Sequence, residues 1–183
     1  MLKLTISAKE LYNDRDECFI DLPSVTVSFE HSLFSLSKWE SKYKKPFLTA
    51  NPKYEKTDAE LRDYLSMMCL QELDPNILRY MNQEETDAIS EYMNDKQTAT
   101  WFDGAMPTKT SSGEITSELI YYWLITFRIP FEVQHWHINR LLTLVDVCNV
   151  KNAGEENQAP LADTIAERDR LNEERLKMYT ENG

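Results

Sequence analysis

Residues 116–147 have the sequence TSELIYYWLITFRIPFEVQHWHINRLLTLVDV. Thr116 offers a helix cap, and the residues up to Phe127 are apolar almost all round, which is typical of a buried helix. Pro130 ends this run, and the apolar spacing predicts a second helix from about Phe131. The first helix is about half as long as a membrane span requires, so we expect the two helices to form a hairpin at the centre of a soluble core.

The first thirty residues have the alternating pattern of half-buried strands. Apolar and polar side chains alternate at residues 2–6 and 25–29, and a third short apolar run lies at residues 18–22. We therefore predict a small N-terminal β meander packed on a helical core. The fold class is α+β, mainly α, with a charged helix at the C-terminus.

The middle of the chain carries several helix start signals. Ser32 is a plausible N-cap for apolar residues that recur at helical spacing up to Tyr43. Residues 57–60 and 82–85 form capping boxes, and a short helix is predicted after Asp74 and the proline that follows it. Three short acidic helices are thus expected between residues 57 and 94.

The expected domain boundaries follow composition. Residues 1–30 are a strand unit that forms one domain with a helical core at residues 31–149. Residues 150–160 have the polar composition of a linker, and residues 161–183 are expected to form a charged helix or tail.

Charge is concentrated in one region of the chain. The formal net charge is −11, and residues 56–95 contribute 10 acidic and 3 basic side chains to it. Such a surface repels phosphates, so we expect no direct binding to nucleic acid. An acidic face of this kind is usually a solvated surface, and a dock for a basic partner is the less common alternative.

The cysteines and the N-terminus indicate a cytoplasmic protein. Cys18, Cys69 and Cys148 are odd in number and lie among apolar neighbours, which predicts buried free thiols in a reducing compartment. The first residues alternate too quickly for a secretory signal, and no apolar run is long enough to span a membrane. We expect a cytoplasmic location and no membrane contact.

Sequence motifs for catalysis are weak. His135 and His137 would point about 200° apart on the predicted helix, so they should not share a metal ion. With 4 glycines in the chain, neither a P-loop nor a dinucleotide fingerprint can form. We expect no cofactor, no metal and no enzymatic activity. A metal-dependent enzyme that uses both histidines remains an unsupported alternative.

Aromatic residues are the remaining specific feature. Most should be core residues, because each buries a large apolar area. A helix that is apolar all round has more surface than a small domain covers easily, so part of it is expected to meet a partner or a second copy of the chain. The candidate partner-binding residues are Trp39, Trp101, Phe102, Tyr121, Tyr122, Trp123 and Trp136.

Several short segments resemble one protein family when they are taken together. They are FEHSL (29–33), SKWES (37–41), KPF (45–47), TATWF (98–102), ITSELIYYW (115–123), IPFE (129–132) and WHINRLL (136–142). In this combination they resemble a family of tailed-bacteriophage proteins described as tail assembly chaperones or as tail-region proteins. The resemblance covers about residues 25–152, which is most of the chain.

The resemblance implies a non-enzymatic role in virion morphogenesis. Chaperones of this kind bind the long helical tape-measure protein and keep it soluble while the tail tube assembles around it. The alternative is a structural virion component of the tail, connector or baseplate. The resemblance assigns no binding residues position by position, so the aromatic candidates above rest on the sequence itself.

Overall fold

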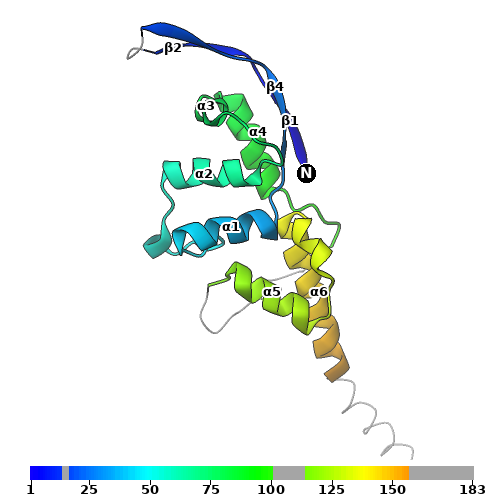
Figure 1. Ribbon diagram of the computed structural model, residues 1–183. Helices are drawn as coiled ribbons and strands as arrows, with labels where there is room; N and C mark the ends of the chain where they lie inside the picture. Colours follow the sequence, from blue (N-terminus) through cyan, green and yellow to red (C-terminus); the bar gives the residue numbers. More distant parts are fainter. Residues whose placement is uncertain (14–16, 101–113, 157–183) are drawn as a thin grey trace, which may run out of the picture. The chain divides into compact units, whose positions relative to one another are not determined.

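The computed structural model of the protein describes residues 1–13, 17–100 and 114–156. Strands occupy the N-terminal part of these residues and helices follow them (Figure 1). The predicted fold class, α+β and mainly α, is confirmed. The chain divides into two compact units, residues 1–145 and 146–183, and the second is described up to residue 156.

The strands form one long antiparallel hairpin in two nested pairs. β1 (Leu2–Ile6) pairs with β4 (Val25–Phe29), and β2 (Lys9–Asn13) pairs with β3 (Cys18–Leu22). The prediction of a strand unit is confirmed, but these strands connect as a nested hairpin and not as a meander. Pro23, which has no N–H to donate, lies in the break between the two pairs.

β4 fastens the hairpin to the helices. The backbone N–H of Glu30 donates to the carbonyl of Met68 at 2.8 Å, and that of Leu70 donates to the carbonyl of Ser28 at 3.0 Å. Val27 and Phe29 of the same strand are fully buried. This strand therefore attaches the hairpin to the helical core through backbone hydrogen bonds and buried side chains.

The first helix, α1 (Leu33–Tyr43), forms as the sequence predicts. Ser32 is its N-cap and completes a capping box with Ser35. Trp39 is buried on the inner face of the helix, where its indole N–H donates to the carbonyl of Glu60 at 2.9 Å. The helix thus packs its apolar stripe inward, as its spacing indicates.

The acidic middle region contains the three short helices that were predicted. Thr57 with Glu60 and Asn82 with Glu85 form reciprocal capping boxes, so each helix start satisfies its own backbone donors. A 3₁₀ turn, η1 (Pro52–Tyr54), precedes them. The helices are α2 (Asp58–Met68), α3 (Pro75–Arg79) and α4 (Gln83–Asn94).

The C-terminal helices differ from the prediction in two respects. α5 (Ser117–Thr126) buries only one face, so it is not the central helix that its apolar sequence suggests. Phe131–His135 forms a 3₁₀ turn, η2, and α6 (Ile138–Glu156) begins seven residues later than expected, because the chain stays extended at Trp136. α6 also includes residues 150–156 of the expected linker, while residues 157–183 lie outside the described residues.

A single core joins the hairpin to the helices of residues 1–145. Its largest fully buried side chains come from β1, β4 and five of the helices. They are Trp39, Tyr64, Phe29, Ile6, Leu33, Leu36, Met68, Ile89, Ile120, Leu124, Ile138 and Leu141.

The thiols are less buried than the sequence predicted. Cys18 is exposed, because it lies at the outer end of β3, and Cys69 and Cys148 are half-buried. All three are free. Burial raises the pKa of the Cys69 thiol to about 12, so this group stays protonated and is a poor nucleophile.

No helix within residues 1–13, 17–100 and 114–156 is both long enough and apolar enough to cross a membrane.

Candidate protein-binding surface

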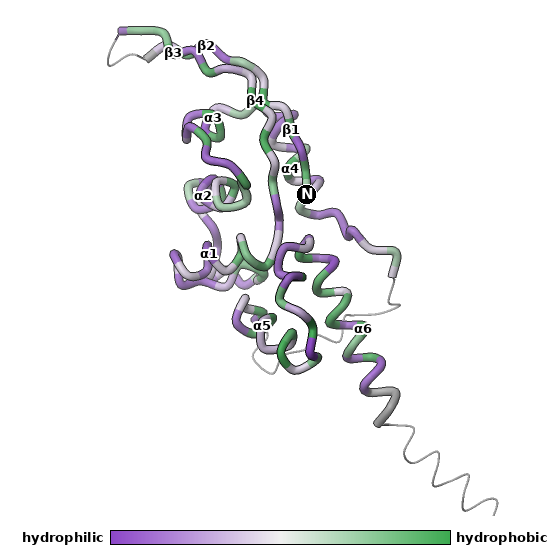
Figure 2. The backbone as a smooth tube through the Cα atoms, turned by 45° about the vertical axis from the view of Figure 1, so that its right-hand side comes forward, coloured by the Kyte–Doolittle hydropathy of each residue, from purple (hydrophilic) through white to green (hydrophobic). Residues whose placement is uncertain are grey.

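The outer face of α5 is apolar and exposed. Ile120 and Leu124 point into the core, and the opposite side of the helix carries Tyr122 and Ile125, which are 60% and 63% exposed. These two residues lie three positions apart, so their side chains are neighbours on one helical face. Strongly apolar segments recur along α5 in the hydropathy view (Figure 2).

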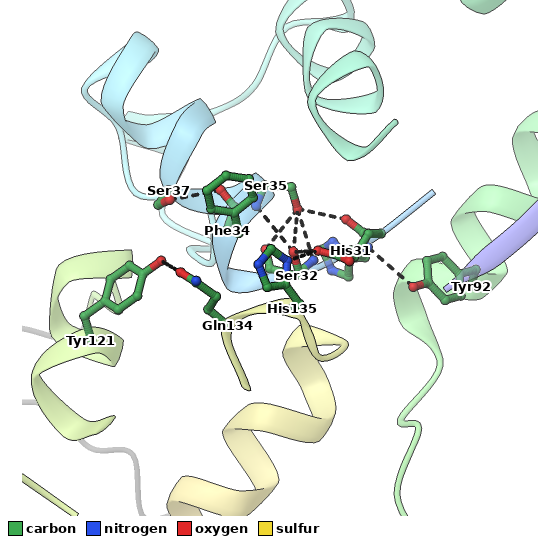
Figure 3. Close-up of polar contacts among 10 residues, drawn as sticks. His31, Ser32, Phe34, Ser35, Ser37, Tyr92, Tyr121, Gln134 and His135 are labelled. Carbon is green, nitrogen blue, oxygen red and sulfur yellow. Dashed lines mark hydrogen bonds and ion pairs between the residues drawn. The ribbon is translucent and has the colours of Figure 1, made fainter. Parts of the chain in front are cut away.

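Two further aromatic residues extend this face toward η2. The ring centroid of Tyr121 lies 6.1 Å from that of Phe131, which is 51% exposed. The hydroxyl of Tyr121 donates to Oε1 of Gln134 at 2.9 Å and so ties α5 to η2 (Figure 3). We call Tyr121, Tyr122, Ile125 and Phe131 the α5 patch.

The buried carboxylate of Glu40 fixes the start of α5. Oε2 of Glu40 accepts a hydrogen bond from the backbone N–H of Ser117 at 2.7 Å, and Oε1 accepts one from that of Phe47, also at 2.7 Å. The carboxylate therefore lies at the positive end of the α5 dipole. Thr116 caps the same turn by accepting from the backbone N–H of Leu119. The α5 patch is thus presented on a helix whose start is fixed.

The predicted aromatic candidates occupy different environments. Trp123 and Trp136 are half-buried, and the guanidinium of Arg140 lies 4.1 Å from the ring centroid of Trp136. Trp39 has no exposed surface, so the structure places it in the core and away from any surface. Trp101 and Phe102 lie outside the described residues.

A second group of polar side chains meets where β4 turns into α1. Nδ1 of His31 and the hydroxyl of Tyr64 are 2.7 Å apart, and the backbone N–H of His31 donates to the hydroxyl of Tyr92. Nε2 of His137 lies 2.9 Å from the carbonyl of Tyr92. Figure 3 shows part of this junction, with His31 joined by a dashed line to the hydroxyl of Tyr92.

The junction is a structural element, because its groups satisfy one another away from water. His31 and His137 are both buried, with ring centroids 5.1 Å apart. Burial, and secondarily the proximity of His137, lowers the pKa of His31 to about 3. Both rings are therefore neutral at pH 7 and serve to join the segment after β4, α2, α4 and the segment between η2 and α6.

The two histidines considered for metal binding are placed differently from the prediction. His135 lies in the 3₁₀ turn η2 and His137 precedes α6, so neither sits on the α-helix that was predicted. Nδ1 of His135 is 2.9 Å from Oε1 of Glu30 at the surface, whereas His137 faces the junction. Among the described residues no three histidine, cysteine or carboxylate side chains are grouped to hold a metal ion.

Sequence reasoning missed two members of the α5 patch, Ile125 and Phe131. Ile125 lies three positions after Tyr122 and could have been paired with it. However, a helix that is apolar all round gives no sign of which side faces solvent. Phe131 was expected at the start of a second helix, but it begins the 3₁₀ turn η2, where it is exposed.

The chain was compared with family models, with curated proteins and with solved structures, and none of them matches it.

Proposed function

We propose that this protein is a non-enzymatic tail assembly chaperone of a tailed bacteriophage, which binds the tape-measure protein through the α5 patch. The observation that carries the proposal is the exposed apolar face made by Tyr122, Ile125 and Phe131. An exposed apolar, aromatic-rich patch is typical of a protein-binding site.

The form of the patch suits a helical partner. Tyr122 and Ile125 project from one face of α5, and Tyr121 and Phe131 add flat aromatic area beside them. Tyrosine is favoured at binding sites, because it buries a large area with few rotatable bonds and keeps a polar tip. An extended helix with an apolar stripe, such as a tape measure, would cover this area.

Charge and the family resemblance support the narrower role. A formal net charge of −11 would keep a loaded complex dispersed. The segments that resemble phage tail chaperones include residues 115–123 and 129–132, which contain three of the four residues of the α5 patch, Tyr121, Tyr122 and Phe131. Such a protein would act in the host cytoplasm.

The experiment is co-expression of the chain with a candidate tape-measure protein, followed by measurement of the tape measure in the soluble fraction. We expect the wild-type chain to retain it and a Tyr122→Ser/Ile125→Ser variant to lose most of this retention. Phe19→Ser is the matched control, because Phe19 is equally exposed but lies in β3. Equal retention by the patch variant and the control would refute the proposal.

Mass spectrometry of purified phage particles tests the alternative role. A chaperone dissociates before the tail is complete and should be absent from the particles. Stoichiometric amounts of the chain in the particles would indicate a structural component of the tail, connector or baseplate instead.

A further inference from the structure

The solvent-facing side of β2 and β3 carries two large aromatic rings. Tyr12 and Phe19 lie opposite each other in the strand register, with ring centroids 5.1 Å apart, and are 53% and 65% exposed. Side chains alternate between the two sides of a strand, and the neighbouring Leu11 and Ile20 are half-buried and pack against the core. The aromatic pair therefore belongs to the side of the hairpin that faces away from the core.

Stabilisation of the hairpin does not account for this side as a whole. Next to the aromatic pair Glu10 lies opposite Asp21; both are exposed, and among the described residues neither forms an ion pair. Like charges directly opposite each other destabilise a pair of strands, which opposes the gain from the aromatic contact. On β1 and β4, by contrast, the exposed side is polar, and the hydroxyls of Thr5 and Thr26 are 2.9 Å apart.

β3 also has an unpaired edge. It pairs with β2 on one side, and no strand among the described residues pairs with it on the other. The free N–H and C=O groups of such an edge are a template for another strand. An added strand would place two of its own side chains, two positions apart, beside Phe19 and Asp21 on the exposed side.

The side chains on the exposed side select the strand that is added. A lysine or arginine beside Asp21 meets a carboxylate that has no partner among the described residues, with Glu10 one strand further away. An apolar side chain two positions along the added strand covers the exposed ring of Phe19. The edge of β3 therefore matches an extended segment in which a basic and an apolar residue alternate with other residues.

The hairpin's charge disfavours a second copy of the chain as this strand. Residues 9–22 carry 5 acidic and 2 basic side chains, and one of the bases, Lys9, is already paired with Glu85. A hairpin from a second copy would bring carboxylates to carboxylates and is repelled. A basic segment of another protein fits the edge better.

We propose that β3 accepts an extended segment of another protein as an added strand, with Lys or Arg beside Asp21 and an apolar residue beside Phe19. This inference does not rest on the proposed phage role, because β3 and the α5 patch share no residue. The contact involves one short strand edge, so the binding is weak and transient.

The first test is an NMR titration of the isotope-labelled full-length chain with an alternating peptide of about seven residues. Lysine, leucine and lysine lie on one side of the extended peptide, with threonine between them. We expect saturable shift changes that are largest in residues 9–22, and binding at least about tenfold tighter than that of the same peptide with glutamate in place of lysine. Equal binding of the two peptides, binding of neither, or larger shift changes outside the hairpin would overturn the proposal.

The second test separates strand addition from contacts of side chains alone. The N–H groups of successive residues point alternately to the two edges of a strand. Methylation of one alternate set of peptide nitrogens therefore blocks pairing with β3, and methylation of the other set does not. We expect one methylated peptide to bind like the parent and the other to bind at least about tenfold more weakly. If the two methylated peptides bind equally, the peptide is not an added strand.

The third test removes the carboxylates. Glu10→Gln/Asp21→Asn should weaken binding of the lysine peptide at least about tenfold. This variant removes a like-charge pair and should not weaken the hairpin, so unfolding would not explain the loss. Glu72→Gln/Glu91→Gln is the matched control, because it removes the same charge from exposed positions outside the hairpin. An equal loss of binding in the two variants would refute the site, because the attraction would then depend on net charge alone.

Phe19→Ser distinguishes this inference from the proposed function. It should weaken binding of the lysine peptide and leave the retention of the tape measure unchanged, so the two proposals can fail separately. A dimer in sedimentation that Phe19→Ser dissociates would refute the inference, because a second copy of the chain would then occupy the edge of β3.

Discussion

α1 and α5 are similar in length and both begin at a hydroxyl N-cap, but they use their apolar residues differently. In α1, 11 residues long, polar side chains separate the apolar ones, and the apolar stripe is buried. In α5, 10 residues long, most side chains are apolar, and Tyr122 and Ile125 face outward. The exposed side of α1 is mostly polar, whereas that of α5 carries Tyr122 and Ile125 between the polar Glu118 and Thr126, and the proposed binding surface rests on this difference.

The largest expected effect lies in α1. Trp39→Ala should lower the free energy of unfolding by about 3–5 kcal/mol, because it removes a fully buried indole and its hydrogen bond to the carbonyl of Glu60. Chemical denaturation measures this loss. A decrease in the free energy of unfolding below about 1 kcal/mol would show that α1 is not part of the scaffold.

The second effect depends on pH and arises at the junction before α1. The pKa of His31 is lowered to about 3 in the folded protein, so the unfolded chain binds a proton near pH 6.5 that the folded chain does not. The folded state should therefore lose stability as the pH falls from about 6.5 toward 3, by at most about 1.4 kcal/mol per pH unit from this group.

Denaturation at several pH values measures this dependence. His31→Gln removes this titrating group and should reduce the slope of the profile between pH 6.5 and 4.5, and the slope that remains should come from His137, whose pKa burial also lowers. The pKa of Glu85 is lowered to about 2, because hydrogen bonds from Lys9 and Ser7 outweigh the opposing effect of burial. Its contribution should be lost only below about pH 4.5. A wild-type profile that is flat from pH 6.5 to 4.5 would contradict the role of His31.

The third effect connects the two helices. Glu40→Gln should cost about 1.5–3 kcal/mol, since an amide cannot accept from the backbone N–H groups of both Ser117 and Phe47 as the carboxylate does. Glu118→Gln is the control on the exposed side of α5. If both variants unfold at the same denaturant concentration as wild type, Glu40 does not hold α5.

The smallest effect on stability should come from the α5 patch. Ile125→Ser should change the free energy of unfolding by no more than about 0.5 kcal/mol, because the side chain is mostly exposed. Ile120→Ser, on the buried face of the same helix, should be strongly destabilising. Similar losses for both variants in chemical denaturation would mean that the outer face of α5 is covered.

Much of the helical scaffold could be predicted from the sequence, because its signals are local. Ser32, Thr57 and Asn82 cap the predicted helices, since a capping residue and its partner lie within three positions of each other. The strand pairing was not predictable in the same way. β1 meets β4 across the whole hairpin, and alternation within a strand does not specify its partner.

The candidate surface was predictable only in part. Tyr122 was among the predicted residues and is exposed, whereas Trp39 was predicted on the same grounds and is buried. Both residues are aromatic and have a large contact area, but tertiary packing decides whether that area faces the core or the solvent. The 3₁₀ turn that exposes Phe131 depends on the same packing.

The nested hairpin implies that amide protection is uneven along the strands. β1 and β4 lie against the helical core, and Lys9 fastens the start of β2 through its ion pair with Glu85. Beyond Lys9 the β2 and β3 ladder is two-stranded, and at its outer end Tyr12 and Phe19 contact each other while remaining exposed. A two-stranded ladder is only marginally stable in water. Backbone hydrogens near Tyr12 should therefore exchange with solvent deuterium through local opening, while those of β4 exchange only when the whole domain unfolds.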